Sequence, residues 1–407
     1  MIPVLSRRGL MLAGAAAAFA PRLAFAATER RFVVIVLRGA MDGIGTVAPL
    51  GDPAYARMRG DLALRAGGPE GAFDLDGFYG LHPALTTLRE LWTAKNLAIL
   101  HAAHTSYRAR SHFDGQDQLE SGGDTPRGLP GGWLNRALGA LADGRSGTRA
   151  GLAVGQTVPL ILRGATEVGA YAPPALPGLE GDFAARLGAL YAADPVFGPA
   201  FAAGARAQAL TEDVLGDEGR RTAMGRGRFD GARRASGRLA QAAGAVGKLL
   251  ADPRGPRVAA LEVGGWDTHN AQGASGGRLA AALREFDEGI AALRDGLGAE
   301  WRRTVVVAMT EFGRTVRPNG TGGTDHGAAS AAFVFGGAVA GGKVHADWPG
   351  LAERELHENR DLRPTMDLRA PIKRLLADHL GIARAILDRD VFPDLAAAPA
   401  FRGDLIG

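Results

Sequence analysis

The stretch from residue 257 to residue 326 contains two apolar segments that end in acidic and histidine residues. The first segment reads Val258-Ala-Ala-Leu-Glu262-Val-Gly-Gly-Trp-Asp267-Thr-His269. The second reads Thr304-Val-Val-Val-Ala-Met-Thr-Glu311-Phe-Gly-Arg314, and a glycine-rich segment with Asp325-His326 follows it. In an open α/β sheet, ligands bind at the carboxyl ends of the strands. Because carboxylates and imidazoles bind divalent metals, the stretch indicates a site like that of a metallohydrolase.

A regular helical pattern connects these two segments. Large apolar residues recur at alternating spacings of four and three residues and stop at a glycine, at positions Leu279, Leu283, Phe286, Ile290, Leu293, Leu297 and Gly298. This spacing places the apolar side chains on one face of an amphipathic helix. A strand, a helix and a second strand in this order predict a right-handed βαβ crossover in a parallel sheet.

Further strands and helices are expected on both sides of this unit. Residues 31–37 form a continuous run rich in β-branched side chains, which is typical of a strand buried on both faces of a parallel sheet. The other candidate strands are residues 96–103, 152–154, 158–162 and 331–335, and helices are expected from near Ser111 and over 370–380. This alternation predicts a doubly wound α/β sandwich with a mostly parallel central sheet.

The 407 residues are expected to form a single α/β domain over residues 27–407. With 46% hydrophobic and 22% charged residues, the chain can bury a full core. Residues 51–80 are rich in glycine, aspartate and proline and are expected to be a surface loop over the site. Residues 180–252 are rich in alanine and arginine without a cluster of metal-binding residue types. They are therefore expected to be an inserted helical segment or cap.

The composition limits the kinds of partner. The formal net charge of +4 comes from arginines spread along the chain and not from a basic block, so nothing indicates nucleic-acid binding. The chain has no cysteine, which excludes disulfides and thiolate ligands. Histidine, aspartate, glutamate and hydroxyl groups must therefore supply any metal ligands.

The first 26 residues have the pattern of a Tat export signal. The twin arginines Arg7 and Arg8 precede an alanine-rich apolar stretch that ends in Ala24-Phe-Ala26. We therefore expect the Tat translocase as a partner during export, and a periplasmic or secreted mature protein without a stable membrane span. The alternative is an N-terminal membrane anchor, although the apolar run is short for a span.

Three candidate metal ligands follow the first strand and the first segment of the central unit. Asp42 comes shortly after the strand 31–37 and precedes a glycine, and a turn-forming role is the alternative. Asp267 and His269 lie two residues apart, so in an extended chain their side chains project to the same side. Both can then reach one ion, and a turn or capping role is again the alternative.

Two more candidates follow the second segment. Glu311 ends the strand that begins at Thr304, and an ion pair with Arg314 is its alternative role. His326 lies next to Asp325 in a glycine-rich loop, where packing in the core is not expected. Together the five candidates predict a site for one or two divalent ions, with zinc, manganese and calcium as the metals considered.

A candidate nucleophile lies after the second strand. Ser111 is expected at the start of a helix, where the helix dipole provides positive potential, and Arg108 and Arg110 could hold charged oxygens of an oxyanion. A simple helix cap is the alternative for Ser111, and Thr46 is the weaker competitor as nucleophile.

His112 and Asp114 are additional candidates because residues two apart at a helix start could reach the same cleft. The other histidines are expected in packing or on the surface, with His104 the nearest to a strand end: His82, His101, His104, His345, His357 and His379.

These motifs resemble the alkaline phosphatase superfamily and, more closely, the Tat-exported bacterial family called domain of unknown function 1501. The stretches that carry the resemblance are Leu37-Arg-Gly-Ala-Met-Asp42-Gly43, Ser111-His-Phe-Asp114, Gly264-Gly-Trp-Asp267-Thr-His269, Thr310-Glu311-Phe-Gly-Arg314 and Gly323-Thr-Asp325-His326-Gly327. The resemblance implies an alkaline phosphatase-like fold in which Ser111 is the nucleophile. It also implies the metal ligands Asp42, Asp267, His269, Glu311 and His326, with Glu262 as a possible outer ligand.

The chain departs from the superfamily pattern at two places. Phe312 stands where the superfamily has a histidine paired with the preceding acid, and the spacing from Asp267 to His269 is two and not four. No cysteine and no Ser-x-Pro-x-Arg motif is present, which argues against formylglycine-type sulfatase chemistry. The resemblance implies an exported metal-dependent hydrolase of small anionic phosphate, sulfate or phosphonate esters. The alternative is a non-catalytic periplasmic binding or assembly protein that retains the fold.

Overall fold

The computed structural model describes residues 30–141, 150–155, 157–171, 186, 189–191, 194, 197–215, 233–397 and 400–407. The expected Tat signal at residues 1–26 lies outside the described residues. In the described part of the chain, no helix is both long enough and apolar enough to cross a membrane.

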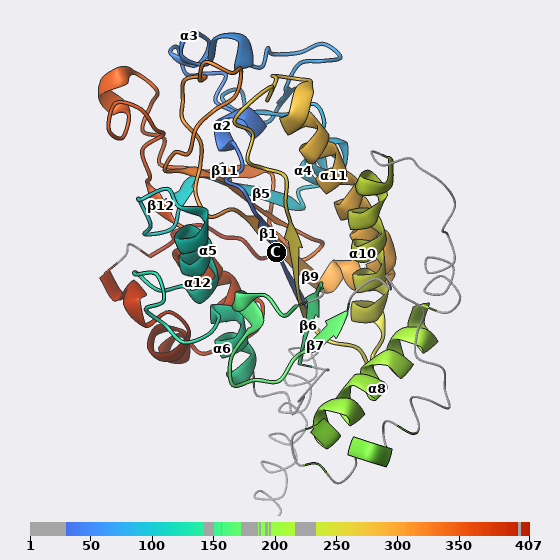
Figure 1. Ribbon diagram of the computed structural model, residues 1–407. Coiled ribbons are helices and arrows are strands. Elements are labelled where there is room, and N and C mark those ends of the chain that lie inside the picture. Colours follow the sequence, from blue (N-terminus) through green and yellow to red (C-terminus); the bar gives the residue numbers. More distant parts are fainter. Residues whose placement is uncertain are drawn as a thin grey trace, which may run out of the picture.

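A central sheet, nine-stranded within the described ranges, forms the middle layer (Figure 1). Its strands are β1 (Arg31–Leu37), β5 (Leu97–His104), β6 (Gly151–Val154), β7 (Gly169–Tyr171), β8 (Val258–Val263), β9 (Thr304–Met309), β10 (Ser330–Phe335), β11 (Lys343–His345) and β12 (Met366–Asp367). The strand order is β11-β5-β10-β9-β1-β8-β6-β7, and β12 pairs with β5. Strand β10 is antiparallel to both of its neighbours, whereas the other pairs are parallel. The predicted α/β class with a mostly parallel sheet is confirmed.

The predicted strand–helix–strand unit is also confirmed. Strands β8 and β9 both pair in parallel with β1, one on each side of it, and α11 (Gly277–Leu297) connects them. The apolar positions of α11 are buried, and the helix ends at Gly298, whose φ of 51° is in the left-handed region that favours glycine.

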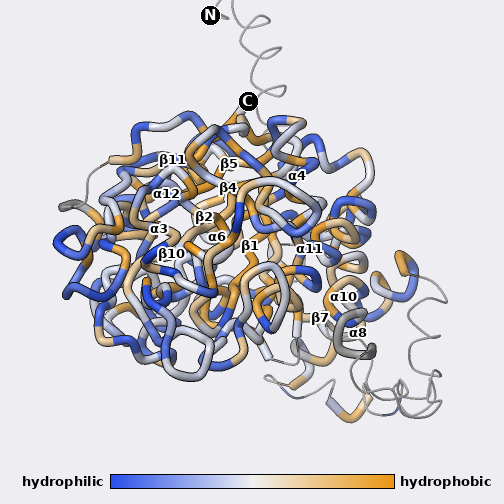
Figure 2. The backbone as a smooth tube through the Cα atoms, turned by 90° about the horizontal axis from the view of Figure 1, so that it is seen from above, coloured by the Kyte–Doolittle hydropathy of each residue, from blue (hydrophilic) through white to orange (hydrophobic). Residues whose placement is uncertain are grey.

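Helices cover both faces of the sheet. Helices α4 (Thr86–Thr93), α10 (Arg233–Ala251) and α11 lie on one side, and α5 (His112–Ser121), α6 (Trp133–Gly139) and α12 (Arg369–Asp378) lie on the other (Figure 1). Because successive side chains of a strand point to opposite faces, β1 serves two cores. Val33 packs in one hydrophobic cluster and Val34 in the other. Figure 2 shows the hydrophobic segments gathered at the sheet and the hydrophilic ones around it.

Shorter elements complete the described chain. A small sheet has the order β2-β4-β3 and consists of β2 (Val47–Ala48), β3 (Phe73–Asp74) and β4 (Gly80–Leu81). The remaining helical elements are α2 (Gly43–Thr46), α3 (Tyr55–Arg59), η1 (Gly60–Leu62), η3 (Leu160–Leu162), α8 (Phe197–Leu215), η4 (Gly298–Arg303), η5 (Glu353–Glu355), α13 (Arg384–Ile386), η6 (Leu387–Val391) and η7 (Pro393–Ala397).

Two expectations about local structure are wrong. The segment 51–80 is not only a surface loop, because it contains α3, whose Met58 and Arg59 are buried in the body of the protein. Residues 158–162 contain the 3-10 helix Leu160–Leu162 and no strand, since Pro159 has no N–H to donate to a neighbouring strand. Within residues 180–252 the described part contains α8 and α10, and the role of this segment as a cap stays a prediction.

Candidate metal centre

The candidate centre lies where several loops leave one edge of the central sheet. Asp267 and His269 follow β8, and Glu311 follows β9. His326 precedes β10, and because β10 runs antiparallel to β9, the start of β10 lies at the same edge as the end of β9. His112 is the first residue of α5 and adds a third imidazole. We call Asp267, His112, His269 and His326 the donor cluster.

The Asp267 carboxylate is the common neighbour of the three imidazoles. Its Oδ1 is 3.0 Å from Nε2 of His269 and 3.2 Å from Nε2 of His326, and its Oδ2 is 3.5 Å from Nε2 of His112. The two nitrogens Nε2 of His269 and His326 are 3.0 Å apart. Ligand atoms of His112, Asp267 and His326 lie within 4.8 Å of one another, which is close enough for one ion to contact all three.

Hydrogen bonds at Nδ1 fix the orientation of all three rings. Each Nδ1 lies near an oxygen, at 2.8 Å between His112 and Glu311, 3.1 Å between His269 and Asp325, and 2.9 Å between His326 and the Arg110 carbonyl. In the neutral form of each ring, Nδ1 donates to one of these acceptor oxygens and Nε2 carries the lone pair. The lone pairs then face the Asp267 carboxylate, and a cation among them removes the repulsion.

The Nε2 atom of His112 is the clearest indication of a ligand site. Nε2 of His112 is buried and has no hydrogen-bond partner among the described residues. Buried polar atoms are nearly always paired, so an orphaned ring nitrogen next to a carboxylate fits a missing ligand. The residues present therefore fit a divalent metal ion with imidazole and carboxylate ligands.

The charge states agree with this arrangement. Burial would raise the pKa of Asp267, but Arg314 and His269 outweigh it and hold the pKa below its usual value. Burial lowers the pKa of His326, which favours the neutral ring. The hydrogen bond to Glu311 raises the pKa of His112, so this ring holds a proton more firmly when no metal is present.

Glu311 contacts the Nδ1 side of His112 and is completely buried. Its carboxylate also accepts hydrogen bonds from the Gly39 amide at 2.9 Å and from Gln116 at 3.2 Å. Burial would raise the pKa of Glu311, but the bond from His112 and the other hydrogen bonds lower it. The structure thus places this predicted ligand where it orients His112, and Thr310 donates to its second oxygen at 2.9 Å.

The structure does not bring Asp42 into the group of close donor atoms. Asp42 is 0% exposed, and its Oδ2 lies 2.5 Å from Nη2 of Arg59 and 2.6 Å from Nε2 of Gln272. Its Oδ1 accepts a hydrogen bond from the Gly45 amide at 3.0 Å and caps α2. Both oxygens of this predicted ligand are therefore engaged within the protein.

Ser111 occupies the N-cap position of α5, directly before His112, but its side chain makes no capping hydrogen bond. The competitor Thr46 is 0% exposed and donates to the Asp42 carbonyl at 2.7 Å. Of the two hydroxyls, only that of Ser111 is both outside the core and next to a member of the donor cluster.

The two predicted oxyanion arginines have other partners. Arg108 donates to the backbone carbonyls of Thr105 and Tyr107. Arg110 forms ion pairs with Asp361 at 2.7 Å and with Glu358 at 2.5 Å. In this conformation the guanidinium of Arg110 is held by carboxylates, and its contribution to the centre is the backbone carbonyl that binds His326.

The other predicted positions are dispersed. Asp114 pairs with Arg127 at 3.5 Å, and Glu262 pairs with Arg38. Three further histidines are buried and each contacts a backbone carbonyl, as packing residues do: His82 with Ala274, His101 with Val47 and His379 with Arg31. The nitrogen Nδ1 of His104 contacts the Thr105 carbonyl and a guanidinium nitrogen of Arg108.

Three residues of the centre were not predicted as part of the site, and Arg314 had been considered only as an ion-pair partner of Glu311. Asp325 orients His269 and is itself held by Asn319, whose Nδ2 lies 3.0 Å from Oδ1 of Asp325. Arg314 is 1% exposed and its Nη1 lies 2.8 Å from Oδ1 of Asp267. For Asp325 and Arg314 the available signals were their places in the quoted motifs, beside His326 and after Glu311, whereas Asn319 lies outside those motifs.

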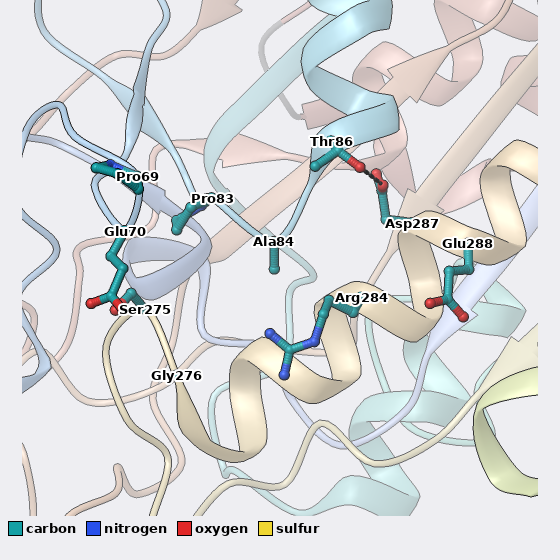
Figure 3. A pocket seen from close by; sticks show the side chains of 10 residues that line it. All are labelled: Pro69, Glu70, Pro83, Ala84, Thr86, Ser275, Gly276, Arg284, Asp287 and Glu288. Atoms are coloured by element: carbon teal, nitrogen blue, oxygen red, sulfur yellow. Dashed lines mark hydrogen bonds between the residues drawn. The ribbon is translucent and has the colours of Figure 1, made fainter. Parts of the chain in front are cut away.

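A hollow of about 640 Å³ lies elsewhere, near the start of α11 (Figure 3). Its lining contains both signs of charge, with Arg284 between Glu70 and Glu288. Asp287 in its wall is engaged with the start of α4, since it accepts hydrogen bonds from the amides of Thr87 and Leu88. The hollow contains no member of the donor cluster.

The fold and the site together define an α/β protein with a candidate metal centre of three histidines and one aspartate. The chain belongs to the family DUF1501, a protein family of unknown function, whose model matches residues 92–392. The matched range contains the whole donor cluster but not Asp42. A comparison with curated proteins finds no match.

Solved structures with a related outline share little sequence with this chain. Ps i-CgsB in complex with k-i-k-neocarrahexaose has 11% identity and a TM-score of 0.40, over 87% of this chain and 72% of that one. The C-terminal periplasmic domain of EcEptC from Escherichia coli, in complex with Zn, has 11% identity and a TM-score of 0.34, over 75% and 72%. A mutant of TAB5 alkaline phosphatase with Mg bound in the M3 site has 13% identity and a TM-score of 0.33, over 75% and 90%.

Proposed function

We propose that the protein is a metal-dependent hydrolase of phosphate esters or related sulfate or phosphonate esters. The observation that carries the proposal is the set of three imidazoles whose Nδ1 groups are bound to oxygens while Nε2 faces Asp267. Tat export of the folded protein to the periplasm or the exterior is part of the proposal and is supported by the twin-arginine pattern at Arg7 and Arg8.

His112, His269, His326 and Asp267 would hold the ion. Three imidazole nitrogens suit zinc or manganese better than calcium, which prefers oxygen ligands. A divalent ion bound there would polarise an ester oxygen and lower the pKa of a bound water or hydroxyl group. Glu311, Asp325 and the Arg110 carbonyl contact the Nδ1 atoms and would orient the Nε2 atoms toward the ion.

Ser111 is the proposed nucleophile. Its hydroxyl is not used for capping, and it lies at the start of a ten-residue helix whose dipole favours negative charge at that end. Arg108 and Arg110 are proposed to steady the charged oxygens of the substrate, which requires their guanidinium groups to leave their present partners. The substrate is proposed to be a small anionic ester because the donor cluster is a compact polar site.

Replacement of Ser111 by alanine tests the role of the hydroxyl group. For Ser111→Ala we expect kcat/KM for p-nitrophenyl phosphate to fall by at least about 1000-fold with unchanged metal content, because the attacking group is lost. Ser106→Ala is the matched control, since Ser106 donates to the Gly123 carbonyl and contacts no member of the donor cluster. Equal activity of both variants would exclude Ser111 as the nucleophile.

A non-catalytic exported binding or assembly protein is the second candidate function. The observation in its favour is that Asp42, Arg108 and Arg110 are engaged within the protein. This candidate predicts a bound metal without turnover. A panel of phosphate, sulfate and phosphonate esters assayed with the metal-loaded protein distinguishes the two, since hydrolysis of any of them excludes the second candidate.

A further inference from the structure

Two buried arginines pair with predicted metal-binding carboxylates, and one of them contacts the donor cluster. Arg59 comes from α3 and Arg314 from the loop after β9, and both side chains are 0% exposed. Each is paired with one of the predicted metal-binding carboxylates, Arg59 with Asp42 at 2.5 Å and Arg314 with Asp267 at 2.8 Å.

We infer that Arg59 and Arg314 take the place of a second metal ion, so that the chain binds a single divalent ion at the donor cluster. The inference rests on the proposed metal centre and specifies how many ions it holds. It narrows the expectation from the sequence, which was one or two ions, to one.

The first argument is the state of Asp42. A second ion would need this carboxylate as a ligand, but both of its oxygens already accept hydrogen bonds from Arg59, Gln272 and the Gly45 amide. Arg59 is fixed in turn, because its Nη1 donates to the carbonyls of Thr315 and Val316 at 3.3 and 3.2 Å. A metal at Asp42 would have to displace a fully buried guanidinium group that is held at three points.

The second argument is the position of Arg314. Its guanidinium group is 0% exposed, and its Nη1 lies 2.8 Å from Oδ1 of Asp267. None of its nitrogens has a hydrogen bond to a described residue apart from the close contact of Nη1 with Asp267. A fixed positive charge on each of the two acids, Arg314 on Asp267 and Arg59 on Asp42, repels a second cation from them.

The third argument is the balance of charge. Arg59 and Arg314 compensate Asp42 and Asp267, and the carboxylates of Glu311 and Asp325 are not paired with arginine by any contact within 4 Å among the described residues. These two negative charges, which have no described arginine in direct contact, match the charge of one divalent ion. A second ion would leave the centre with an excess of positive charge.

The test is to count bound ions on the purified protein. The protein is stripped with a chelator and dialysed against micromolar Zn²⁺ or Mn²⁺, and bound metal is measured by elemental analysis and native mass spectrometry. We expect one ion per chain in the unaltered protein and in Asp42→Asn, with affinities within about twofold of each other, and none in Asp267→Asn.

The outcomes separate this inference from the proposed function. Two ions per chain, or loss of the ion in Asp42→Asn, would overturn the inference while leaving a metal-dependent function intact. No bound ion in the unaltered protein would overturn both. If Asp42→Asn does not fold, the count in the unaltered protein still decides, and Arg59→Lys, which keeps the cation, provides a second variant that should bind one ion.

Discussion

Two acids at the ends of neighbouring parallel strands have opposite environments in this protein. Asp42 follows β1 and is 0% exposed against Arg59, whereas the side chain of Asp267, after β8, is 44% exposed and faces three imidazoles. Both were predicted to bind metal because strand ends are where ligands bind. The difference teaches that the groups which neighbouring elements bring to a carboxylate decide whether it is a ligand or part of an internal ion pair.

The environment of each acid follows from what packs against it. Helix α3 delivers a guanidinium to Asp42, which neutralises the carboxylate and satisfies its hydrogen bonds. Around Asp267, the Nδ1 atoms of the three rings contact Glu311, Asp325 and a backbone carbonyl, and the Nε2 atoms face the carboxylate. The first acid is therefore satisfied by the protein alone, and the second is arranged for a cation.

The largest effect is expected from Asp267→Ala. The substitution removes the carboxylate shared by all three imidazoles, so metal affinity should fall by more than 100-fold, since even residues that only orient ligands contribute about 10–100-fold. Isothermal titration with Zn²⁺ or Mn²⁺ measures the effect. Asp295→Ala, at a side chain on α11 that is 78% exposed, is the control and should bind as the unaltered protein does.

The environment of Asp42 is tested by Arg59→Met. Removing one partner of a buried ion pair leaves Asp42 uncompensated, so the free energy of unfolding should fall by about 3–5 kcal/mol. Urea denaturation measures it, with Arg57→Met on the exposed side of α3 as the control. If Arg59→Met reduced the free energy of metal binding by more than it reduced the free energy of unfolding, the assignment of the Arg59–Asp42 pair as purely internal would be wrong.

A residue behind the donor cluster should have a smaller effect. Asp361 is 0% exposed and holds Arg110, a non-glycine residue with a φ of 62° whose carbonyl orients His326. For Asp361→Asn we expect metal affinity to fall by about 10–100-fold. Glu358→Gln removes the more exposed partner of Arg110 and should change affinity by less than about twofold. Equal effects would mean that the buried contact does not position His326.

The smallest effect concerns pH. Metal binds the neutral ring of His112, and because Glu311 raises the pKa of this ring, its proton must be displaced over a wider range of pH. Below that pKa, affinity should fall about tenfold for each unit that the pH decreases, and above it affinity should not depend on this group. Competition with a chromophoric chelator between pH 5.5 and 8 measures the profile. In Glu311→Gln the pH below which metal affinity falls should be lower, and in Arg59→Met it should be unchanged.

Local sequence patterns predicted most of the secondary structure. The periodic apolar positions of α11 and the β-branched run of β1 were sufficient because burial repeats with the period of the element. The same reasoning failed at residues 158–162, where Pro159 prevents strand pairing, and at α3, whose buried residues lie within a segment rich in turn formers. The candidate site was predicted in part, since Asp267, His269 and His326 are together and His112 was only an additional candidate.

By itself, the sequence determined which elements form and which acidic and histidine residues lie at strand ends, because these properties depend on neighbours within a few residues. Only the tertiary structure decided which carboxylate is neutralised and which oxygen each ring nitrogen contacts. His112 meets Glu311 across 199 positions of the chain, and His326 meets the Arg110 carbonyl across 216. Hydrogen bonds and ion pairs depend on distances of a few ångströms between such distant residues, and packing of the elements sets those distances.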